Sequence, residues 1–435
     1  GAGFRQKCLC GTFCTSHRKY LRRIMKKRIA VLAAFVVIFS VLFYIAAANG
    51  EDVFAHNHYD SYTRQALAWH EGKTSLEVEK SSVAYLELAF FEDKIYVSFP
   101  PVPSCIEFFL TPFFGQNTPN QMYGYLYCLI SGFALTCLFL RKHPPATAVC
   151  YGLLCSVGTN FLGIILFGGV WHEAQGLSFM LCSLAVALIS SPKKWCWGLS
   201  LFFAALAVGC RPFTVLFLPF LLWELYQHIR KDGTAKFQVF KRFSLYLIAP
   251  AMVAVSLMAY NYARFGNPLE FGHNYLPEFV NSENGQFSLA YLPQNLTQIF
   301  QLPEFIWKNI SVLGTEIFVP AGVKFNMYTA SAFYLVNPVI LVFMVFVFTN
   351  CLKSRDKLTD ISWLCIFLIF ILVTCMHKTL GGCQFGARYF IDMIPYLALY
   401  LSKQDLKAGA GAWGICIFSI ALNIYGAGLV AEYFL

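Results

Sequence analysis

Long apolar stretches recur along the chain from about residue 29 to the C-terminus, separated by polar connections. A membrane-spanning helix needs about 20 consecutive, predominantly apolar residues. A large soluble core is the alternative for any one stretch, but a helix in such a core carries its apolar residues on one face. These stretches are apolar all round. The pattern therefore predicts an all-α polytopic membrane protein with about eleven transmembrane helices.

The predicted spans lie near residues 29–49, 121–140, 146–167, 174–190, 196–210, 212–227, 244–263, 331–351, 361–376, 386–402 and 411–431. Two neighbouring spans are short, and Arg211-Pro212 lies between them. Because proline interrupts a helix, we expect a tight helical hairpin here, with one kinked span as the alternative.

Composition and charge support a membrane protein anchored by basic residues. The 435 residues are 57% hydrophobic and 13% charged, whereas soluble domains are typically about 25% charged. Residues 18–28 hold seven basic residues and no acid. Such a run can bind nucleic acid, but directly before an apolar span it favours a cytoplasmic anchor on anionic lipid. No small-residue cleavage site follows, so we do not expect a cleaved signal peptide.

The positive-inside rule orients the spans. Counted from a cytoplasmic N-terminus, every short basic connection falls on one side. These connections are 141–143, 193–194, 230–242, 353–357 and 403–407. We therefore divide the chain into a basic cytoplasmic segment, 1–28, and a transmembrane domain, 29–435, whose large outer loops are 50–120 and 266–330. The outer loops are predicted to carry short interfacial helices, and the membrane is predicted to be a bacterial plasma membrane.

Asp60 is the leading candidate for a catalytic group. It precedes a helical pattern that places Tyr62, Ala66 and Trp69 on one face and stops at Gly72. One interpretation makes Asp60 an N-cap, whose side-chain oxygen accepts a backbone hydrogen bond. The other makes it a general base beside His56 and His58 at the membrane surface. The sequence leaves both open.

Cationic residues at the predicted outer ends of spans are candidates for binding a phosphate. They are Arg211, Arg264, Lys378 and Arg388. Arg388 and Asp392 are four residues apart, so a mutual ion pair is the alternative role for both. Further residues predicted to line an acceptor pocket are His56, His58, Tyr62, Lys94, Tyr96, His172, Glu173 and Tyr389.

Cofactor motifs give no positive signal. The chain has neither a G-x-x-x-x-G-K-[ST] nor a G-x-G-x-x-G phosphate-binding motif. His56, His58, His172 and His377 are all predicted to lie on the outer side, yet no two share the i, i+4 spacing of helical metal ligands. We therefore predict no cofactor and no nucleic-acid partner, with a divalent cation as the alternative.

Several short motifs resemble those of the GT-C superfamily of membrane glycosyltransferases, especially the protein mannosyltransferases and aminoarabinose transferases. The motifs are Asp60 with Tyr62, Ala66 and Gly72; Lys94-Ile95-Tyr96 with Ser98-Phe99-Pro100-Pro101; Arg211-Pro212; 261–268; and 385–389. Their order and spacing extend to about residue 400. The family's first outer loop often carries paired acids, whereas here Ser61 follows Asp60.

The resemblance implies an inverting transferase that moves a sugar from a polyprenyl-phosphate donor to a glycan, lipid or protein acceptor outside the cell. In that scheme Asp60 is the base and the four cations bind the donor phosphate. Two alternatives remain: a transporter or flippase of lipid-linked glycans, whose charges are expected near the bilayer midplane, and a non-catalytic protein of the same fold.

Overall fold

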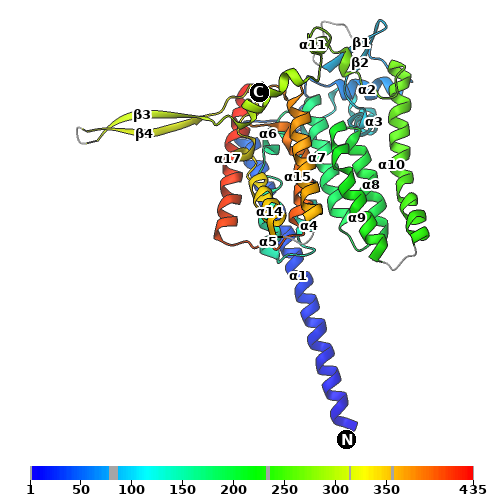
Figure 1. Cartoon of the computed structure of the whole chain (residues 1–435), viewed down its shortest axis with the longest axis vertical. Helices are drawn as coiled ribbons and strands as arrows, with labels where there is room; N and C mark the ends of the chain where they lie inside the picture. The colour runs from blue at the N-terminus through cyan, green and yellow to red at the C-terminus, as the bar shows by residue number, and fades with distance from the viewer. Residues whose placement is uncertain (1, 78–86, 232–235, 313–314, 354–356, 435) are drawn as a thin grey trace.

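The computed structural model describes residues 2–77, 87–231, 236–312, 315–353 and 357–434. Within these ranges, six helices are long and apolar enough to cross a membrane. They run roughly side by side (Figure 1) and are α1 (Ala2–Ala48), α4 (Gln121–Phe139), α7 (Val170–Ile189), α10 (Lys236–Phe265), α15 (Lys357–Cys375) and α17 (Ala410–Phe434).

Shorter helical segments occupy the remaining predicted spans. They are α5 (Pro145–Leu154), α6 (Phe161–Ile165), α8 (Lys194–Val208), η3 (Pro212–Phe217), α9 (Leu218–Lys231), α13 (Phe333–Val336), α14 (Val339–Lys353), η6 (Arg388–Met393) and α16 (Ile394–Leu401). The predicted all-α polytopic architecture is therefore confirmed. The number of spans stays a prediction, because several spans consist of two short segments.

The expected helical hairpin is present. The chain leaves α8 at Gly209, and Pro212 opens the 3₁₀ turn η3, which leads into α9. Figure 1 shows α8 and α9 side by side. Proline fits the first turn of a helix but cannot continue one, which explains the reversal here.

Both large loops lie at one end of the bundle, which we call the loop end (Figure 1). The first contains α2 (Ser61–His70), β1 (Leu88–Phe91), β2 (Lys94–Val97), α3 (Val102–Phe114) and η2 (Gly115–Asn117). The second contains η4 (His273–Tyr275), α11 (Pro277–Val280), η5 (Leu289–Tyr291), α12 (Leu292–Phe300), β3 (Glu304–Val312) and β4 (Thr315–Lys324).

The sequence reasoning missed two antiparallel β-hairpins in these loops, β1–β2 and β3–β4. In the first, Leu88 pairs with Val97 and Phe91 with Lys94, and the turn residues Glu92 and Asp93 have φ of 47° and 59°. Tight hairpin turns with positive φ are usually signalled by Asn-Gly or Asp-Gly. A Glu-Asp turn carries no such signal.

Two of the basic connections, 141–143 and 403–407, meet at the opposite end of the bundle. Lys142 hydrogen-bonds to the Lys403 carbonyl, and Lys403 forms an ion pair with Glu224. Nearby, Arg141 Nη2 donates to the Ala187 carbonyl at 3.0 Å. These connections therefore share one end, as the charge pattern predicts. Their assignment to the cytoplasm stays a prediction.

Two buried elements carry side chains up to the loop end. Helix α7 is buried along nearly its whole length, and every residue of α16 is buried. Phe217 of η3 stacks on Tyr396 of α16 with ring centroids 4.6 Å apart. The first turn of α7 and the segment η6 before α16 are therefore held firmly beneath the loops.

Candidate active site

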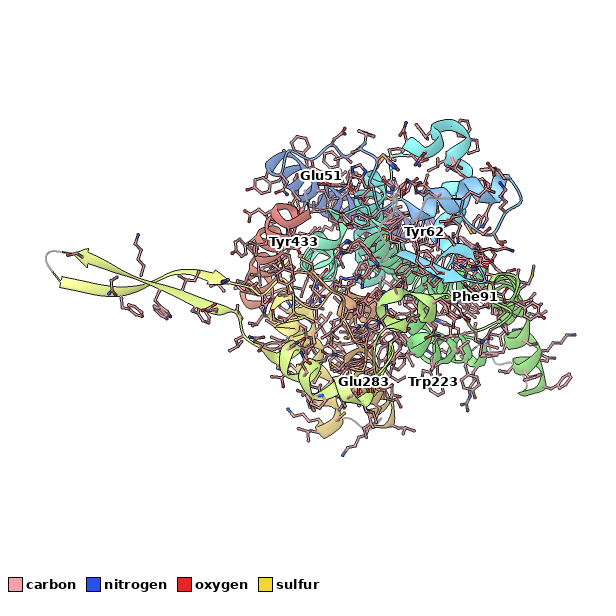
Figure 2. All side chains as sticks on the ribbon, turned by 90° about the horizontal axis from the view of Figure 1, so that it is seen from above. Glu51, Tyr62, Phe91, Trp223, Glu283 and Tyr433 are labelled. Carbon is pink, nitrogen blue, oxygen red and sulfur yellow. The ribbon has the colours of Figure 1, made fainter. Side chains whose placement is uncertain are left out.

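A cleft at the loop end consists of two adjoining cavities of about 350 and 310 Å³. Both are lined by Phe99, His273, His377 and Tyr389. Figure 2 looks down on the molecule from above, with the loops toward the viewer. The walls come from both outer loops, the start of α7, the turn before η3 and the connection from α15 to η6. The fold thus brings together segments that are far apart in the sequence.

Arg211 and Arg388 lie on either side of the division between the two cavities. Arg388 lines the larger cavity and Arg211 the smaller. The guanidinium carbon of Arg388 lies 5.0 Å from the centre of the Tyr389 ring, and that of Arg211 lies 4.5 Å from it. Two of the four predicted phosphate-binding cations therefore converge on one aromatic side chain.

The ion pair between Arg388 and Asp392, which the sequence offered as the alternative role of both residues, does not form. Asp392 instead accepts from Arg211 Nε at 3.1 Å. The two residues lie in η6, a 3₁₀ helix. With about three residues per turn, positions four apart no longer share a face. The i, i+4 argument assumed an α-helix and was wrong for this reason.

Arg388 is 6% exposed, and its hydrogen-bond partners are neutral. Its Nε donates to the Gly381 carbonyl at 2.8 Å, and its Nη1 donates to Gln175 Oε1 at 3.0 Å. Among the ion pairs of the described residues, none involves Arg388. A buried charge without a counter-ion is costly, so this guanidinium is suited to an anionic ligand.

Gly381 shapes the pocket around Arg388. Its φ is +111°, and a Cβ added here would lie 2.9 Å from Gln384 Oε1 and 3.2 Å from Arg388 Nε. A side chain would therefore strain the backbone and crowd the guanidinium that its carbonyl positions.

Lys378 and Arg264 donate hydrogen bonds to acceptors of the protein. Lys378 Nζ donates to the Glu278 carbonyl at 2.9 Å. Arg264 donates to the Val97 carbonyl at 2.9 Å and to Asn261 Oδ1 at 3.0 Å, so it fastens β2 to the end of α10. Neither residue lines either cavity.

The histidines of the cleft are neutral hydrogen-bonding groups. Burial lowers the pKa of His273 to about 4 and that of His377 to about 3. His273 Nδ1 lies 2.5 Å from the Ser98 carbonyl, and His377 Nε2 lies 3.2 Å from Gln286 Nε2. His172, at the start of α7, lines the larger cavity. The positive charge in the cleft therefore comes from the arginines.

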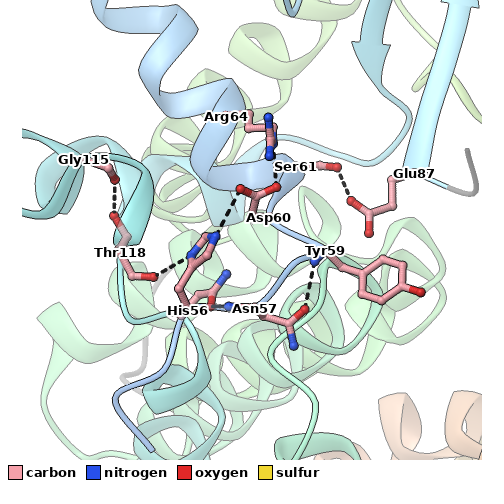
Figure 3. A network of polar contacts seen from close by, with 10 residues as sticks. His56, Asn57, Tyr59, Asp60, Ser61, Arg64, Glu87, Gly115 and Thr118 are labelled. Carbon is pink, nitrogen blue, oxygen red and sulfur yellow. Dashed lines mark hydrogen bonds and ion pairs between the residues drawn. The ribbon is translucent and has the colours of Figure 1, made fainter. Parts of the chain in front are cut away.

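Asp60 lies in a polar network beside the cleft (Figure 3). It is 1% exposed. Arg64 Nε lies 2.6 Å from its Oδ1, and His56 Nε2 lies 3.2 Å from its Oδ2. Although Asp60 occupies the N-cap position of α2, its side chain makes no capping hydrogen bond. The capping interpretation therefore does not describe this carboxylate.

The network keeps Asp60 ionised. Burial raises the pKa of its carboxyl, but the hydrogen bonds and charges of His56 and Arg64 outweigh burial and leave the pKa below its usual value. The hydrogen bond to Asp60 in turn raises the pKa of His56, with burial acting against it. The site therefore contains a carboxylate held by an arginine and by a histidine whose pKa the carboxylate raises.

A second acid lies next to this network. Ser61 Oγ donates to Glu87, which reaches the site from the start of β1. Burial raises the pKa of Glu87 to about 8, so it is mostly protonated at neutral pH. Residue 61 is a serine, yet the fold still places a second carboxyl group beside Asp60.

Tyr59 connects Asp60 to the cleft. Its ring lines the larger cavity and lies 5.0 Å from Trp171, while its carbonyl accepts from Val170 N at 3.2 Å. Figure 3 shows the Tyr59 ring and the Asp60 carboxylate pointing in different directions. Asp60 thus lies one residue from the cleft wall, with its carboxylate directed at His56 and Arg64.

The other predicted pocket residues divide into two groups. Tyr62 and Glu173 are buried between α2 and the start of α7, near the cleft. His58 and Lys94 are exposed, and Tyr96 packs on Phe265 with ring centroids 5.2 Å apart. The structure therefore does not bring His58, Lys94 or Tyr96 into the cleft.

Sequence reasoning missed Gln175, Gly381, His273 and Glu87. Gln175 had a usable signal, because an amide inside an apolar span needs a partner. Its Nε2 donates to the Arg388 carbonyl at 2.8 Å and to Asp392 Oδ1 at 3.1 Å. The others depend on contacts between distant segments, which no local pattern marks.

No known family model matches the chain, and no curated protein matches it in sequence. Solved structures are similar in fold. ArnT from Cupriavidus metallidurans bound to undecaprenyl phosphate has 11% identity over 90% of this chain and 62% of that one, with a TM-score of 0.49. The Archaeoglobus fulgidus oligosaccharyltransferase has 11% identity over 93% of this chain and 55% of that one. Its TM-score is 0.46 without ligand and 0.45, as AglB, with an inhibitory peptide and dolichol-phosphate.

These neighbours belong to the GT-C superfamily that the motifs resemble. The chain covers less than two thirds of the length of each. At this identity and TM-score the likeness assigns neither a substrate nor a residue role. The roles proposed below therefore rest on the contacts of this chain.

Proposed function

We propose that the protein is an inverting glycosyltransferase that moves a sugar from a polyprenyl-phosphate donor to an acceptor at the loop end, on the extracytoplasmic side. The observation that carries the proposal is Arg388. It is a buried guanidinium with neutral partners, in a cleft at the end of an apolar bundle. A lipid phosphate is an anion that can reach this position from the membrane.

Arg211 and Arg388 are suited to hold the phosphate of the donor. A guanidinium binds phosphate oxygens with two parallel hydrogen bonds. Both groups are already positioned, Arg211 by Asp392 and Arg388 by Gln175 and Gly381. Cations fixed in advance stabilise charge that develops on a leaving group without further reorganisation. This supports a role in departure of the phosphate.

The chemical step needs one base and no nucleotide. The acceptor oxygen attacks the anomeric carbon, and the bond from that carbon to the phosphate oxygen breaks. The phosphate leaves with the electron pair, and the acceptor proton passes to the base. A single displacement inverts the anomeric configuration. Asp60 is our candidate base because the network keeps it ionised.

The transporter alternative is less well supported by the charge distribution. The arginines of the cleft lie at the loop end of the bundle. The buried Asp360 lies in the first turn of α15, at the opposite end. A transporter is expected to keep such groups near the midplane. Sugar transfer measured in liposomes separates a glycosyltransferase from a transporter.

The test measures sugar transfer in liposomes from a panel of polyprenyl-phosphate sugars. Wild-type protein is compared with Arg388→Gln and with Lys353→Ala, a cation at the end of α14. We expect donor-dependent transfer that Arg388→Gln abolishes and Lys353→Ala keeps. Movement of the lipid-linked sugar across the bilayer, without transfer to any acceptor, would instead identify a flippase.

A further inference from the structure

The β3–β4 hairpin projects sideways from the body, far beyond the helices (Figures 1 and 2). We call the pair of strands Glu304–Val312 and Thr315–Lys324 the arm. It lines neither cavity of the cleft. An isolated two-stranded hairpin is at best marginally stable in water. Its projection therefore suggests that another surface supports it.

The strand register places aromatic residues on one face of the arm, near its base, and charged residues on the other. Trp307 pairs with Pro320 and Asn309 with Phe318, while Glu304 pairs with Lys324. Because neighbouring residues of a strand point to opposite faces, Phe305, Trp307 and Phe318 share one face. Glu304, Lys308 and Lys324 share the other, together with Ile306.

The aromatic face is exposed. Phe305 is 54%, Trp307 49% and Phe318 64% exposed, and Trp307 stacks on Phe318 with ring centroids 5.2 Å apart. Phe300 and Leu302, just before the arm, are 55% and 57% exposed. A contiguous apolar surface of this kind marks an interaction site.

Contacts at the base of the arm set its level along the bundle. Tyr425 Oη of α17 donates to the Val323 carbonyl at 3.2 Å. Tyr425 is about 22 Å along the helix axis from Ala410 at about 1.5 Å per residue, and the hydrocarbon core is about 30 Å thick. Farther along α17, the ring of Tyr433 packs on that of Tyr328, with the ring centroids 5.5 Å apart. Counted from Ala410, the arm therefore leaves the body within about 8 Å of the outer edge of the hydrocarbon.

From these observations we propose that the arm lies on the membrane surface, with its aromatic face in the interfacial region and its charged face toward water. Tryptophan and other aromatic residues favour this region. Open strand edges are excluded from the hydrocarbon because their backbone groups need partners. Headgroups and interfacial water supply them. The charged face carries both acidic and basic residues, so it has no single sign of charge with which to bind anionic lipid. The partner is thus the lipid surface, and insertion of the aromatic side chains holds the arm on it.

The test places photoreactive benzoylphenylalanine at position 307, 318 or, as the control on the opposite face, 308. Protein in liposomes is irradiated, and adducts are identified by mass spectrometry. We expect several-fold more lipid adduct from 307 and 318 than from 308. Cross-links mainly to a second copy or to another protein in native membranes would overturn the proposal, as would equal, low lipid yields at all three positions.

A second measurement tests depth. The fluorescence of Trp307 is obtained as the difference between wild-type protein and Trp307→Phe. We expect lipids brominated near the headgroup end of the acyl chain to quench it strongly, and lipids brominated near the chain terminus to quench it weakly. Quenching by a water-soluble quencher alone would show that the arm stands clear of the membrane.

Discussion

The protein holds two acid–arginine pairs at its loop end, and they are built differently. Asp60 is enclosed by Arg64 and His56 and has a neutral acid, Glu87, beside it. Asp392 also has an arginine partner, Arg211, but a second arginine lies nearby with neutral partners only. The first site is a carboxylate satisfied within the protein, and the second has a cation left for a ligand.

The difference suggests a division of labour. A carboxylate kept ionised suits proton acceptance, and a fixed guanidinium without a counter-ion suits binding of an anion. The two sites are joined through Tyr59, whose ring lines the cavity that Arg388 also lines. The proposed reaction needs both functions within reach of one donor and one acceptor.

The largest effect is expected at Asp60. Asp60→Asn keeps the size of the side chain but cannot accept a proton. General base catalysis contributes about 100- to 10,000-fold, so transfer should fall at least about a hundredfold. The measurement is the transfer rate from a polyprenyl-phosphate donor, with apparent Tm as the folding control.

A matched control is Asp360→Asn. Asp360 is also a buried aspartate, and it accepts from Tyr400 Oη at 2.7 Å far from the cleft. Its substitution should leave transfer close to wild type. Near-normal transfer by Asp60→Asn would end the base assignment and direct attention to Glu173, buried at the start of α7.

The next effect concerns Arg388. Arg388→Ala removes a fixed cation from the leaving phosphate, and loss of one such group typically costs about 100- to 1,000-fold. Donor use should weaken greatly, and Arg388→Lys should restore it only in part, because lysine lacks the bidentate geometry. Donor titrations for these variants and for Lys353→Ala measure the effect. An unchanged donor affinity in Arg388→Ala would move the phosphate site to Arg211.

These two sites show what the sequence could and could not predict. The helices were predictable because a span of apolar residues is a local property. Arg211 and Arg388 were identifiable as charged residues at the ends of such spans, and Asp60 as an acid before a helical pattern in the first outer loop. Their partners were not: a pair between Arg388 and Asp392 was the alternative that an α-helical spacing offered, whereas η6 is a 3₁₀ helix. Glu87 reaches Ser61 only through tertiary packing.

The same reasoning explains why three of the predicted site residues line neither cavity. Arg264, Lys94 and Tyr96 belong to motifs next to a span or strand, but the fold uses Arg264 to hold the Val97 carbonyl. A motif gives the order of residues along the chain. It does not reveal which side of a strand faces the cleft.

The third prediction tests the Arg211–Asp392 pair as a structural element. Asp392 is 2% exposed, and removing one partner of a buried ion pair typically costs about 3–5 kcal/mol. Asp392→Asn should therefore lower the apparent Tm more than Asp60→Asn does, because the Arg64 side chain is 23% exposed and the Arg211 side chain 16%. Thermal unfolding of both variants and of Arg211→Gln/Asp392→Asn checks this. An equal or smaller loss for Asp392→Asn would contradict it.

The smallest effect is a pH dependence of stability whose sign distinguishes the Asp60 site from the histidines of the cleft. The pKa of His56 is raised in the folded protein. Its stabilising charge is therefore fully present below the unfolded value, about 6.5, and is lost as pH rises through the folded pKa. The pKa of Asp60 is lowered, so its contribution is present above about 4 and is lost as pH falls through the folded pKa. The pair should stabilise most between these limits.

Apparent Tm of wild type minus that of His56→Gln should be largest near pH 6 and should decline toward pH 8. The same difference for His377→Gln should instead rise from pH 6 to pH 8, because burial keeps His377 neutral in the folded protein while the unfolded chain binds a proton below about 6.5. A difference for His56→Gln that grows toward pH 8 would show that the histidine is neutral in the folded protein and that Arg64 alone holds Asp60 ionised.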